Sequence, residues 1–316
     1  MTVLIWMPEG KGLGRFRVVS RLYQALKKFG CGVVVSSTQR DELNFFGVPA
    51  PLGGIEAYDA LVFEMWPILG AQLRMETTAL IKEFHRQKPN GKVYSLLRDV
   101  AGSACLDLSL VERFVDTILV RGDGQIGITE TWPLKAGLLD RVRHVGYFGP
   151  DSLPRTVTPD WVFSAGGSWF ERANLIGPLV QGLHAVHSPL RSSLRLFTSE
   201  ITVRPSEEYL SRLAASGFSV LQAGYNSVME ALCFGVPAIF FPAARFVRSE
   251  QIYRMRRFTE LGIVAGCWQY VEFPELPGRL EAAYQKASTL APPEKRLRFG
   301  GETEAARIIV GGHQCQ

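Results

Sequence analysis

Residues Leu221 to Pro242 read LQAGYNSVMEALCFGVPAIFFP, the pattern of a strand end, a tight turn, a helix and a second strand. A glycine at position 224 lets the backbone turn sharply, and we expect the helix to begin near Asn226 or Ser227. The apolar run from Ala238 to Phe241 has the length of a buried strand. The stretch therefore predicts a β-α-β unit of a parallel sheet.

Two interpretations of this turn stay open at this point. Ser227 and Glu230 have the spacing of a capping box. In a capping box, the side chain of each residue accepts a hydrogen bond from the otherwise unsatisfied backbone amide of the other. That arrangement accounts for the turn without any ligand. Free amides at a helix N-terminus also favour an anion, which would make the same turn a binding site.

Outward from this unit, apolar runs of strand length alternate with amphipathic runs of helix length through most of the chain. The helical patterns include 15–29 and 72–87. The expected strands are Val3–Met7, Gly32–Ser36, Ala60–Glu64, Lys92–Leu97, Thr117–Val120, His144–Tyr147, Trp161–Ala165, Leu194–Thr198, Ser219–Leu221 and Ala238–Phe241. This alternation predicts the α/β class with parallel sheets.

A proline-rich connection divides the chain almost in half. Residues 148–160 contain three prolines and little that could be buried, so they should form an exposed linker. We expect an N-terminal domain over 1–149, a linker over 150–160 and a C-terminal domain over 161–316. In such a pair of α/β domains, a ligand cleft is expected where the carboxyl ends of the strands face each other.

A second glycine-rich turn follows the first expected strand. Gly10, Gly12 and Gly14 precede the helix that starts near Arg15, so the backbone can approach an anion closely there. A dinucleotide fingerprint fits poorly, because the third glycine comes one position early and no acidic residue ends the second strand. The lysine and serine of a Walker loop are also missing, and a tight turn without a ligand stays open. Gly166, Gly167 and Ser168 end the first strand of the second domain in the same style.

Composition narrows the class of protein. The chain has 316 residues, 47% hydrophobic and 21% charged, which excludes disordered, collagen-like and coiled-coil proteins. No segment approaches the roughly 18 to 20 apolar residues of a membrane span, and the N-terminal apolar run lacks the features of a secretory signal. We therefore expect a cytoplasmic protein.

The sequence gives little support for metal binding or for nucleic-acid binding. Five scattered cysteines form no C-x-x-C pair, and His184 and His187 have no third ligand nearby, so we expect neither a metal site nor disulfides. The net charge of +5 permits nucleic acid, an anionic membrane or a phosphorylated ligand. Only 254–258 combines basic and aromatic residues, and a solvated helix face explains that run, so we expect no nucleic acid.

The amino-acid sequence from Gly224 onward resembles that of a known family. Its pattern G-x-N-[ST]-x-x-E-x-x-x-x-G-x-P-x-x-x-x-P, followed by Glu250-Gln251, is similar to the nucleotide-sugar-binding half of the GT-B glycosyltransferases. Within that class, the pattern particularly resembles the family of the peptidoglycan N-acetylglucosaminyltransferase and the plant monogalactosyldiacylglycerol synthases, and the chain is more similar still to a bacterial group of predicted glycosyltransferases. Glu64-Met-Trp-Pro67 and 95–99 also resemble this bacterial group.

The resemblance implies a GT-B fold, with two Rossmann-like domains whose parallel sheets face an interdomain cleft. It implies a nucleoside diphosphate sugar as the donor, usually with uracil as the base, and no metal or other cofactor. Helix amides would hold the diphosphate, Glu230 the ribose hydroxyls, Gln251 with Glu250 the donor sugar, and Val203 the base. The donor-binding residues implied are Gly12, Gly14, Gly166, Gly167, Ser168, Val203, Gly224, Tyr225, Asn226, Ser227, Glu230, Glu250 and Gln251.

The implied reaction is displacement at the anomeric carbon by an acceptor hydroxyl, with inversion. The family usually carries a histidine where this chain has Arg15, and an arginine is not a base near neutral pH. Arg15 would instead neutralise a diphosphate. Glu64 and Asp99 both follow apolar strands, so we expect the general base to be Glu64 ahead of Asp99. For each, a plain surface-turn carboxylate is the alternative, and Asp99 could pair with Arg98.

The acceptor is the least defined partner. The apolar residues 65–69 could contact a lipid-linked acceptor at an anionic membrane, or could pack over the core; a glycan acceptor is also compatible. A nucleotide-sugar hydrolase or epimerase of the same fold is the nearest alternative function. A non-catalytic subunit that binds nucleotide sugar is another, supported by Arg15. A nicotinamide oxidoreductase fits the glycine spacing poorly.

Overall fold

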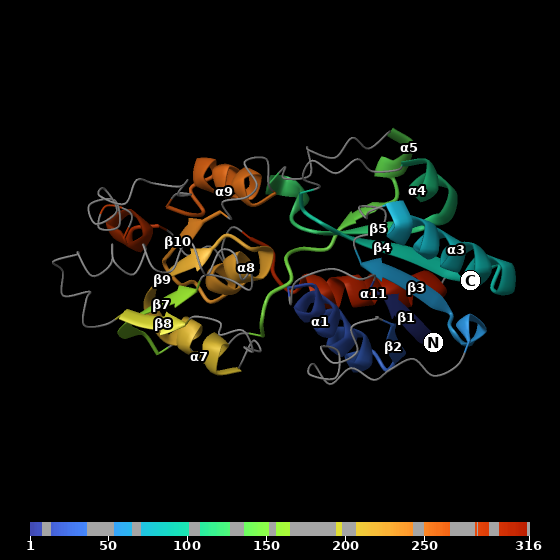
Figure 1. Ribbon diagram of the computed structural model, residues 1–316, viewed down its shortest axis with the longest axis horizontal. Helices are drawn as coiled ribbons and strands as arrows, with labels where there is room; N and C mark the ends of the chain where they lie inside the picture. Colours follow the sequence, from blue (N-terminus) through green and yellow to red (C-terminus); the bar gives the residue numbers. More distant parts are fainter. Residues whose placement is uncertain are drawn as a thin grey trace. The chain divides into compact units, whose positions relative to one another are not determined.

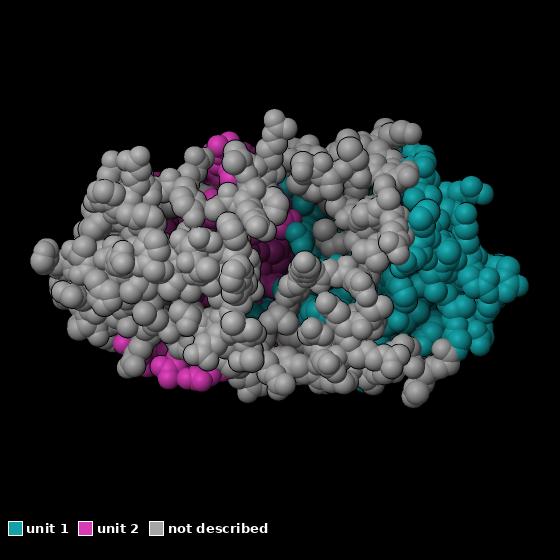
Figure 2. All heavy atoms as spheres, in the orientation of Figure 1, with its two compact units in different colours: residues 1–148, 298–316 teal, residues 149–297 magenta. Residues whose placement is uncertain are grey.

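The computed structural model describes residues 1–7, 14–36, 54–64, 71–100, 108–126, 136–151, 156–164, 194–197, 207–242, 250–265, 282, 284–290 and 297–314. The chain divides into two compact units (Figure 2). Unit 1 comprises residues 1–148 and 298–316, and unit 2 comprises residues 149–297. Each unit is built on a parallel sheet, which confirms the predicted α/β class.

Unit 1 contains a six-stranded sheet in the order β2-β1-β3-β4-β5-β6, with every neighbouring pair parallel. The strands are β1 (Thr2–Trp6), β2 (Gly32–Ser36), β3 (Ala60–Glu64), β4 (Lys92–Arg98), β5 (Thr117–Arg121) and β6 (Val142–His144). The central strands are almost wholly buried, because helices cover both faces of an all-parallel sheet. That burial explains why they are continuous apolar runs in the sequence.

The helices of unit 1 fall on two faces because right-handed crossovers run in opposite directions along the sheet. The helices are α1 (Gly14–Lys28), α3 (Ala71–Gln87), α4 (Leu108–Phe114), α5 (Ala136–Leu139) and α11 (Gly301–Gln314), with short 3₁₀ turns η1 (Ile55–Ala57) and η2 (Gly124–Ile126). The α1 crossover leads from β1 outward to β2, whereas the α3 and α4 crossovers lead the other way. Figure 1 shows α1 and α11 side by side, across the sheet from α3 and α4.

Unit 2 contains a four-stranded parallel sheet in the order β10-β9-β7-β8. The strands are β7 (Thr158–Ser164), β8 (Leu194–Phe197), β9 (Ser216–Gln222) and β10 (Ala238–Phe241). The described helices of this unit include α7 (Glu207–Ala215), α8 (Tyr225–Cys233) and α9 (Glu250–Glu260). The strand order reverses between β7 and β9, since β8 lies on one side of β7 and the later strands lie on the other.

Several strand boundaries differ from the sequence predictions, and two of these differences lie at the connection between the units. The last strand of unit 1 was expected over His144–Tyr147, but β6 ends at His144, since only 142–144 pair with β5. Residues 145–148 then lead toward unit 2, and Tyr147 forms an isolated parallel bridge with Phe299. Strand β7 begins at Thr158, inside the stretch expected to be linker.

The C-terminal segment returns to unit 1, whereas the sequence analysis had assigned residues up to 316 to the second domain. Tyr147 donates its backbone amide to the carbonyl of Arg298 at 2.8 Å, and Tyr94 of β4 donates its hydroxyl to the Ile309 carbonyl of α11 at 3.2 Å. Burial raises the pKa of Tyr94 to about 12, so this hydroxyl stays a donor across the physiological range. Helix α11 is thereby fixed against the sheet of the first unit.

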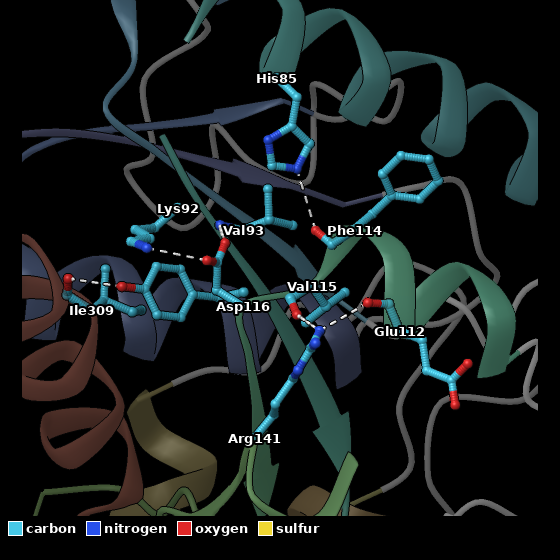
Figure 3. Close-up of polar contacts among 10 residues, drawn as sticks. His85, Lys92, Val93, Glu112, Phe114, Val115, Asp116, Arg141 and Ile309 are labelled. Atoms are coloured by element: carbon cyan, nitrogen blue, oxygen red, sulfur yellow. Dashed lines mark hydrogen bonds and ion pairs between the residues drawn. The ribbon is translucent and has the colours of Figure 1, made fainter. Parts of the chain in front are cut away.

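Polar contacts stabilise the amino ends of the central strands in unit 1 (Figure 3). Asp116 accepts hydrogen bonds from the Val93 amide at 2.9 Å and from the Lys92 ammonium at 3.2 Å. Arg141 donates to the carbonyls of Glu112 at 2.9 Å and Val115 at 2.7 Å, which are orphan acceptors at the end of α4. The opposite, carboxyl edge is where open parallel sheets generally bind their ligands.

Replacement of Gly301 by alanine should destabilise unit 1 by about 2 kcal/mol, because the new methyl group would overlap the Gly146 carbonyl. Gly311, in the same helix, is the matched control, since a methyl group there meets no other atom within 4 Å. Gly311→Ala should leave stability unchanged or raise it by up to about 1 kcal/mol through helix propensity. Urea unfolding of both variants checks this, and equal stability of the two would contradict the docking of α11 at Gly146.

Candidate functional site

The topology of unit 2 marks one position for a ligand. In open parallel sheets, ligands bind beyond the carboxyl ends of the strands where the strand order reverses. In unit 2 that position lies beyond Ser164, the end of β7, and Gln222, the end of β9. Helix α8 begins three residues after β9, so its N-terminus stands at this position.

The N-terminus of α8 has the form of an anion site. Gly224 is the N-cap, with extended backbone angles of φ −65° and ψ 147° and no side-chain cap. The first hydrogen bond within the helix runs from the Val228 amide to the Gly224 carbonyl at 3.0 Å, so the amides of residues 225–227 precede the helical ladder. The capping-box interpretation is wrong, because Ser227 is the third residue of the helix and not its cap.

Glu230 lies on the same helix and is fully buried. Burying a carboxylate costs several kcal/mol unless polar groups surround it. A surface glutamate would avoid that cost, so the buried Glu230 is a candidate for binding a polar ligand beside the turn. This is the residue for which the resemblance implied contacts to ribose hydroxyls.

Helix α9 brings further polar residues to α8. The Arg254 guanidinium carbon lies 5.3 Å from the centre of the Tyr225 ring, and Tyr225 is the first residue of α8. Glu250 and Gln251, both partly exposed, precede Arg254 by four and three residues, so they share its face of α9. The structure therefore places five predicted donor-side positions, 224–227 and 230, in the first part of α8 and the turn before it, and the Arg254–Tyr225 contact joins this helix to α9, which carries Glu250 and Gln251.

The sequence analysis expected residues 254–258 to form a solvated helix face, and the structure corrects this, because part of the run is buried. Arg254, Met255 and Phe258 are buried, and the more exposed Arg257 forms an ion pair with Glu260 at 3.3 Å. The basic run therefore spans both sides of an amphipathic helix, because Arg254 is buried while Arg256 is exposed.

In unit 1 the strand order reverses between β1 and β3, and a buried ion cluster lies at that edge. Glu64 ends β3 and accepts from Arg15 Nε at 2.5 Å, while Arg121 at the end of β5 approaches its other oxygen at 3.3 Å. Arg15 also donates to the Glu64 carbonyl at 3.3 Å. Strand alternation explains the meeting, because residues 62, 64, 119 and 121 point to the face that α1 covers.

These contacts change the expected role of Glu64. Its side chain is fully buried, and each carboxylate oxygen contacts a guanidinium group, so the carboxylate is the shared anion of two arginines. We expected Glu64 to be the leading candidate for the general base; the geometry instead favours a structural role. It holds Arg15, at the start of α1, and Arg121 at one edge of the sheet.

Asp99 is the other predicted base, and it directly follows β4. Its side chain is fully buried, and a methyl group on Gly122 would stand 2.8 Å from its Cβ. Asp99 thus packs against the turn that follows Arg121, at the same carboxyl edge as Glu64. It is not the surface-turn carboxylate of the alternative interpretation, and it stays the candidate base.

The sequence analysis did not single out three residues whose side chains could take part in binding or catalysis. Arg121 and Arg254 are buried cations whose partners lie in other elements, so no local motif marks them. His144 ends β6, and burial lowers its pKa from the ordinary histidine value, which keeps the ring neutral near pH 7. A single histidine at a strand end carries no spacing signal that would have identified it.

Several predicted positions lie outside the described residues. These are Gly12, Gly166, Gly167, Ser168, Val203 and the apolar loop 65–69. Gly14 is described and is the first residue of α1. The contacts predicted between all of these residues and the donor or acceptor stay predictions.

Two features are absent from the described ranges. Within them, no three histidine, cysteine, aspartate or glutamate side chains gather closely enough to hold a metal ion. None of the helices in those ranges has both the length and the apolar character needed to cross a membrane.

Solved structures share this architecture along the whole chain. MurG of Acinetobacter baumannii matches with a TM-score of 0.65 and 12% identity, over 98% of this chain and 100% of that one. The spinosyn rhamnosyltransferase SpnG matches with a TM-score of 0.62 and 12% identity, over 99% and 100%. The UDP-GlcNAc 2-epimerase of Neisseria meningitidis, bound to UDP-GlcNAc, matches with a TM-score of 0.57 and 12% identity, over 100% of both chains.

No protein-family model matches the sequence, and no curated protein is detectably similar to it. At these identities the structural likeness establishes the fold alone. The fold is of the GT-B type that the sequence predicted, with a Rossmann-like sheet in each unit.

Proposed function

We propose that the protein is an inverting, metal-independent glycosyltransferase that moves a sugar from a nucleoside diphosphate sugar, with uridine as the expected nucleoside, to an acceptor hydroxyl. The observation that carries this proposal is the N-terminus of α8, which has no side-chain cap, lies at the strand-order reversal of unit 2 and shares its helix with the buried Glu230. Transferases among the similar folds, one complexed with thymidine diphosphate, support it.

Each group at the α8 turn has a specific part in this reaction. Backbone amides of residues 225–227 and the helix dipole would stabilise the diphosphate as it leaves, which is the work a metal ion does elsewhere. Glu230 would accept hydrogen bonds from ribose hydroxyls, since a carboxylate offers acceptors only. Gln251 and Glu250 would hold the donor sugar.

Unit 1 would supply the acceptor side. Asp99 is the proposed general base, because Glu64 is engaged by two arginines and Arg15 stays charged. The acceptor would be lipid-linked or a glycan. For a lipid-linked acceptor, the protein would act in the cytoplasm at the inner face of the membrane, and flotation with anionic liposomes would test that contact.

A second candidate function is supported by one comparison. A structure of the same fold is a UDP-GlcNAc 2-epimerase, so an epimerase or hydrolase acting on a nucleotide sugar fits the same donor turn. Incubation with UDP-sugars in the absence of any acceptor separates the functions. Turnover without acceptor would favour the second, while turnover that needs an added hydroxyl would favour transfer.

Nucleoside diphosphates should raise the melting temperature of the full chain, because a ligand that binds only the folded state stabilises it. We expect UDP at about 100 times its Kd to add about 2.7 kcal/mol, while NAD adds nothing. A thermal-shift panel of UDP, TDP, GDP, their sugar conjugates and NAD makes the measurement. A shift with NAD alone would contradict the proposed function.

A further inference from the structure

Two segments of unit 1, residues 144–147 at the end of β6 and residues 298–301 at the start of α11, form a close contact that we call the α11 clasp. The Tyr147 amide donates to the Arg298 carbonyl at 2.8 Å, and the Gly301 amide donates to the Tyr147 carbonyl at 3.1 Å. Unit 1 loses the chain just after the first segment and regains it at the second. The clasp therefore joins the helix α11 and both connections to unit 2 at one place in unit 1.

His144 is the one titratable ring among these residues that changes charge near neutral pH. Its ring is half-buried against η2, where a methyl group on Gly124 would stand 2.9 Å from Cδ2 of the histidine. The backbone carbonyl of His144 accepts a hydrogen bond from the Arg298 guanidinium. Its Nδ1 atom is buried and has no hydrogen-bond partner among the residues that the structure describes. A protonated ring carries a hydrogen on both nitrogens, so it would place an unpaired donor at this buried position.

The charges around the ring add to this effect. Burial lowers the pKa of His144, the Arg298 guanidinium lowers it further, and Asp123, in the turn before η2, acts in the opposite direction. The Asp123 carboxylate already accepts a hydrogen bond from the Gln125 amide at 3.0 Å, and on β5 the residue beside His144 is the apolar Val120. A solvated histidine has a pKa of about 6.5, so as the pH falls below that value an opened clasp takes up a proton more readily than a closed one.

We propose that His144 is a pH-sensitive switch: the α11 clasp is closed while the ring is neutral and opens when the ring takes up a proton. Opening exposes the ring to water, which pairs with its second N–H group, and separates the imidazolium from the Arg298 guanidinium. Mild acid would thus release α11 and the two connections to unit 2 from one another. The inference goes beyond the proposed function, because no step of it involves a nucleotide.

Hydrogen–deuterium exchange of the full chain at about pH 7.5 and about pH 5.5 tests the switch, with each rate divided by that of a free amide at the same pH. In the wild type, the amides of Tyr147 and Gly301 should lose protection by about fivefold or more at the lower pH. The amides of β3, at the centre of the sheet, should keep theirs. His144→Gln has a side chain that does not titrate, so the two clasp amides should be equally protected at both pH values.

His144→Phe repeats the comparison with a ring of similar shape, should glutamine disturb the packing against Gly124. His85→Gln is the matched control, because His85 lies in α3 on the other face of the sheet and should leave the acid response of the clasp as in the wild type. Wild-type protection of the clasp that does not change with pH would overturn the inference. An acid response retained in the His144 variants, or an equal loss of protection in β3, would also overturn it, because the clasp would then open through another group or through unfolding of the whole unit.

Discussion

Replacement of Glu64 by glutamine is expected to destabilise unit 1 by about 3 to 5 kcal/mol, the usual cost of removing one partner from a buried ion pair. The variant leaves Arg15 and Arg121 facing a neutral amide, in a place where the carboxylate is fully buried. An amide is nearly the same size as the carboxylate, so lost packing would not explain the change. Chemical denaturation of the wild type and the variant measures the difference.

Glu83→Gln is the matched control, because Glu83 forms an exposed ion pair with Arg86 in helix α3 of the same unit. Hydrogen bonds from Arg86 and Gln87 lower the pKa of Glu83 to about 2, yet solvent screens that pair and its removal should have little effect on stability. A second comparison is the double variant Arg15→Gln, Glu64→Gln, whose cost should be smaller than the sum of the two single costs. Wild-type stability of Glu64→Gln would contradict the structural role and return Glu64 as the candidate base.

Replacement of Glu230 by glutamine is expected to weaken UDP binding about 100-fold, equivalent to about 2.7 kcal/mol. Hydrogen bonds to a charged acceptor contribute about 1.5 to 3 kcal/mol, and a buried carboxylate could accept two from a ribose. Binding is measured by calorimetry below the melting temperature of the variant, after circular dichroism has shown that it is folded. Glu260→Gln, an exposed residue of α9 in the same unit, serves as the control and should bind UDP as the wild type does.

A deoxyribose ligand makes the assignment to ribose specific. The wild type should bind 2′-deoxy-UDP more weakly than UDP. Glu230→Gln should weaken the binding of 2′-deoxy-UDP by a smaller factor than it weakens the binding of UDP. Fully additive losses would show that Glu230 acts elsewhere in the site. Unchanged UDP affinity in Glu230→Gln would remove the residue from the donor site altogether.

Much of the fold follows from local sequence. The predicted bounds of β2, β3 and β10 are those observed, because a buried parallel strand is a short apolar run enclosed by turn residues. The turn before α8 was also located correctly, since glycine before an amphipathic helix fixes the backbone path at Gly224. The helix start was misplaced by one or two residues, because Asn226 and Ser227 are good caps but the backbone of Gly224 serves instead.

What depends on distant contacts could not be predicted in this way. Glu64 was placed correctly at a strand end, but its partner Arg121 is 57 residues away and belongs to another strand. Arg254 resembles a solvated residue in sequence, but it is buried, and its contact with the Tyr225 ring comes from another helix. The return of α11 to the first unit is of the same kind, since Tyr94 and Ile309 meet across 215 residues.

Hydrogen–deuterium exchange of the full chain, with and without UDP, tests the central claim most directly because it locates the bound diphosphate. The proposed site predicts slower exchange of the backbone amides of residues 225–227 in saturating UDP, since those amides would donate to the phosphates. The amides of β4 and β5 in unit 1 should exchange at unchanged rates. UDP binding that leaves the start of α8 unprotected, or no UDP-dependent change anywhere in the chain, would contradict the assignment of α8 as the donor site.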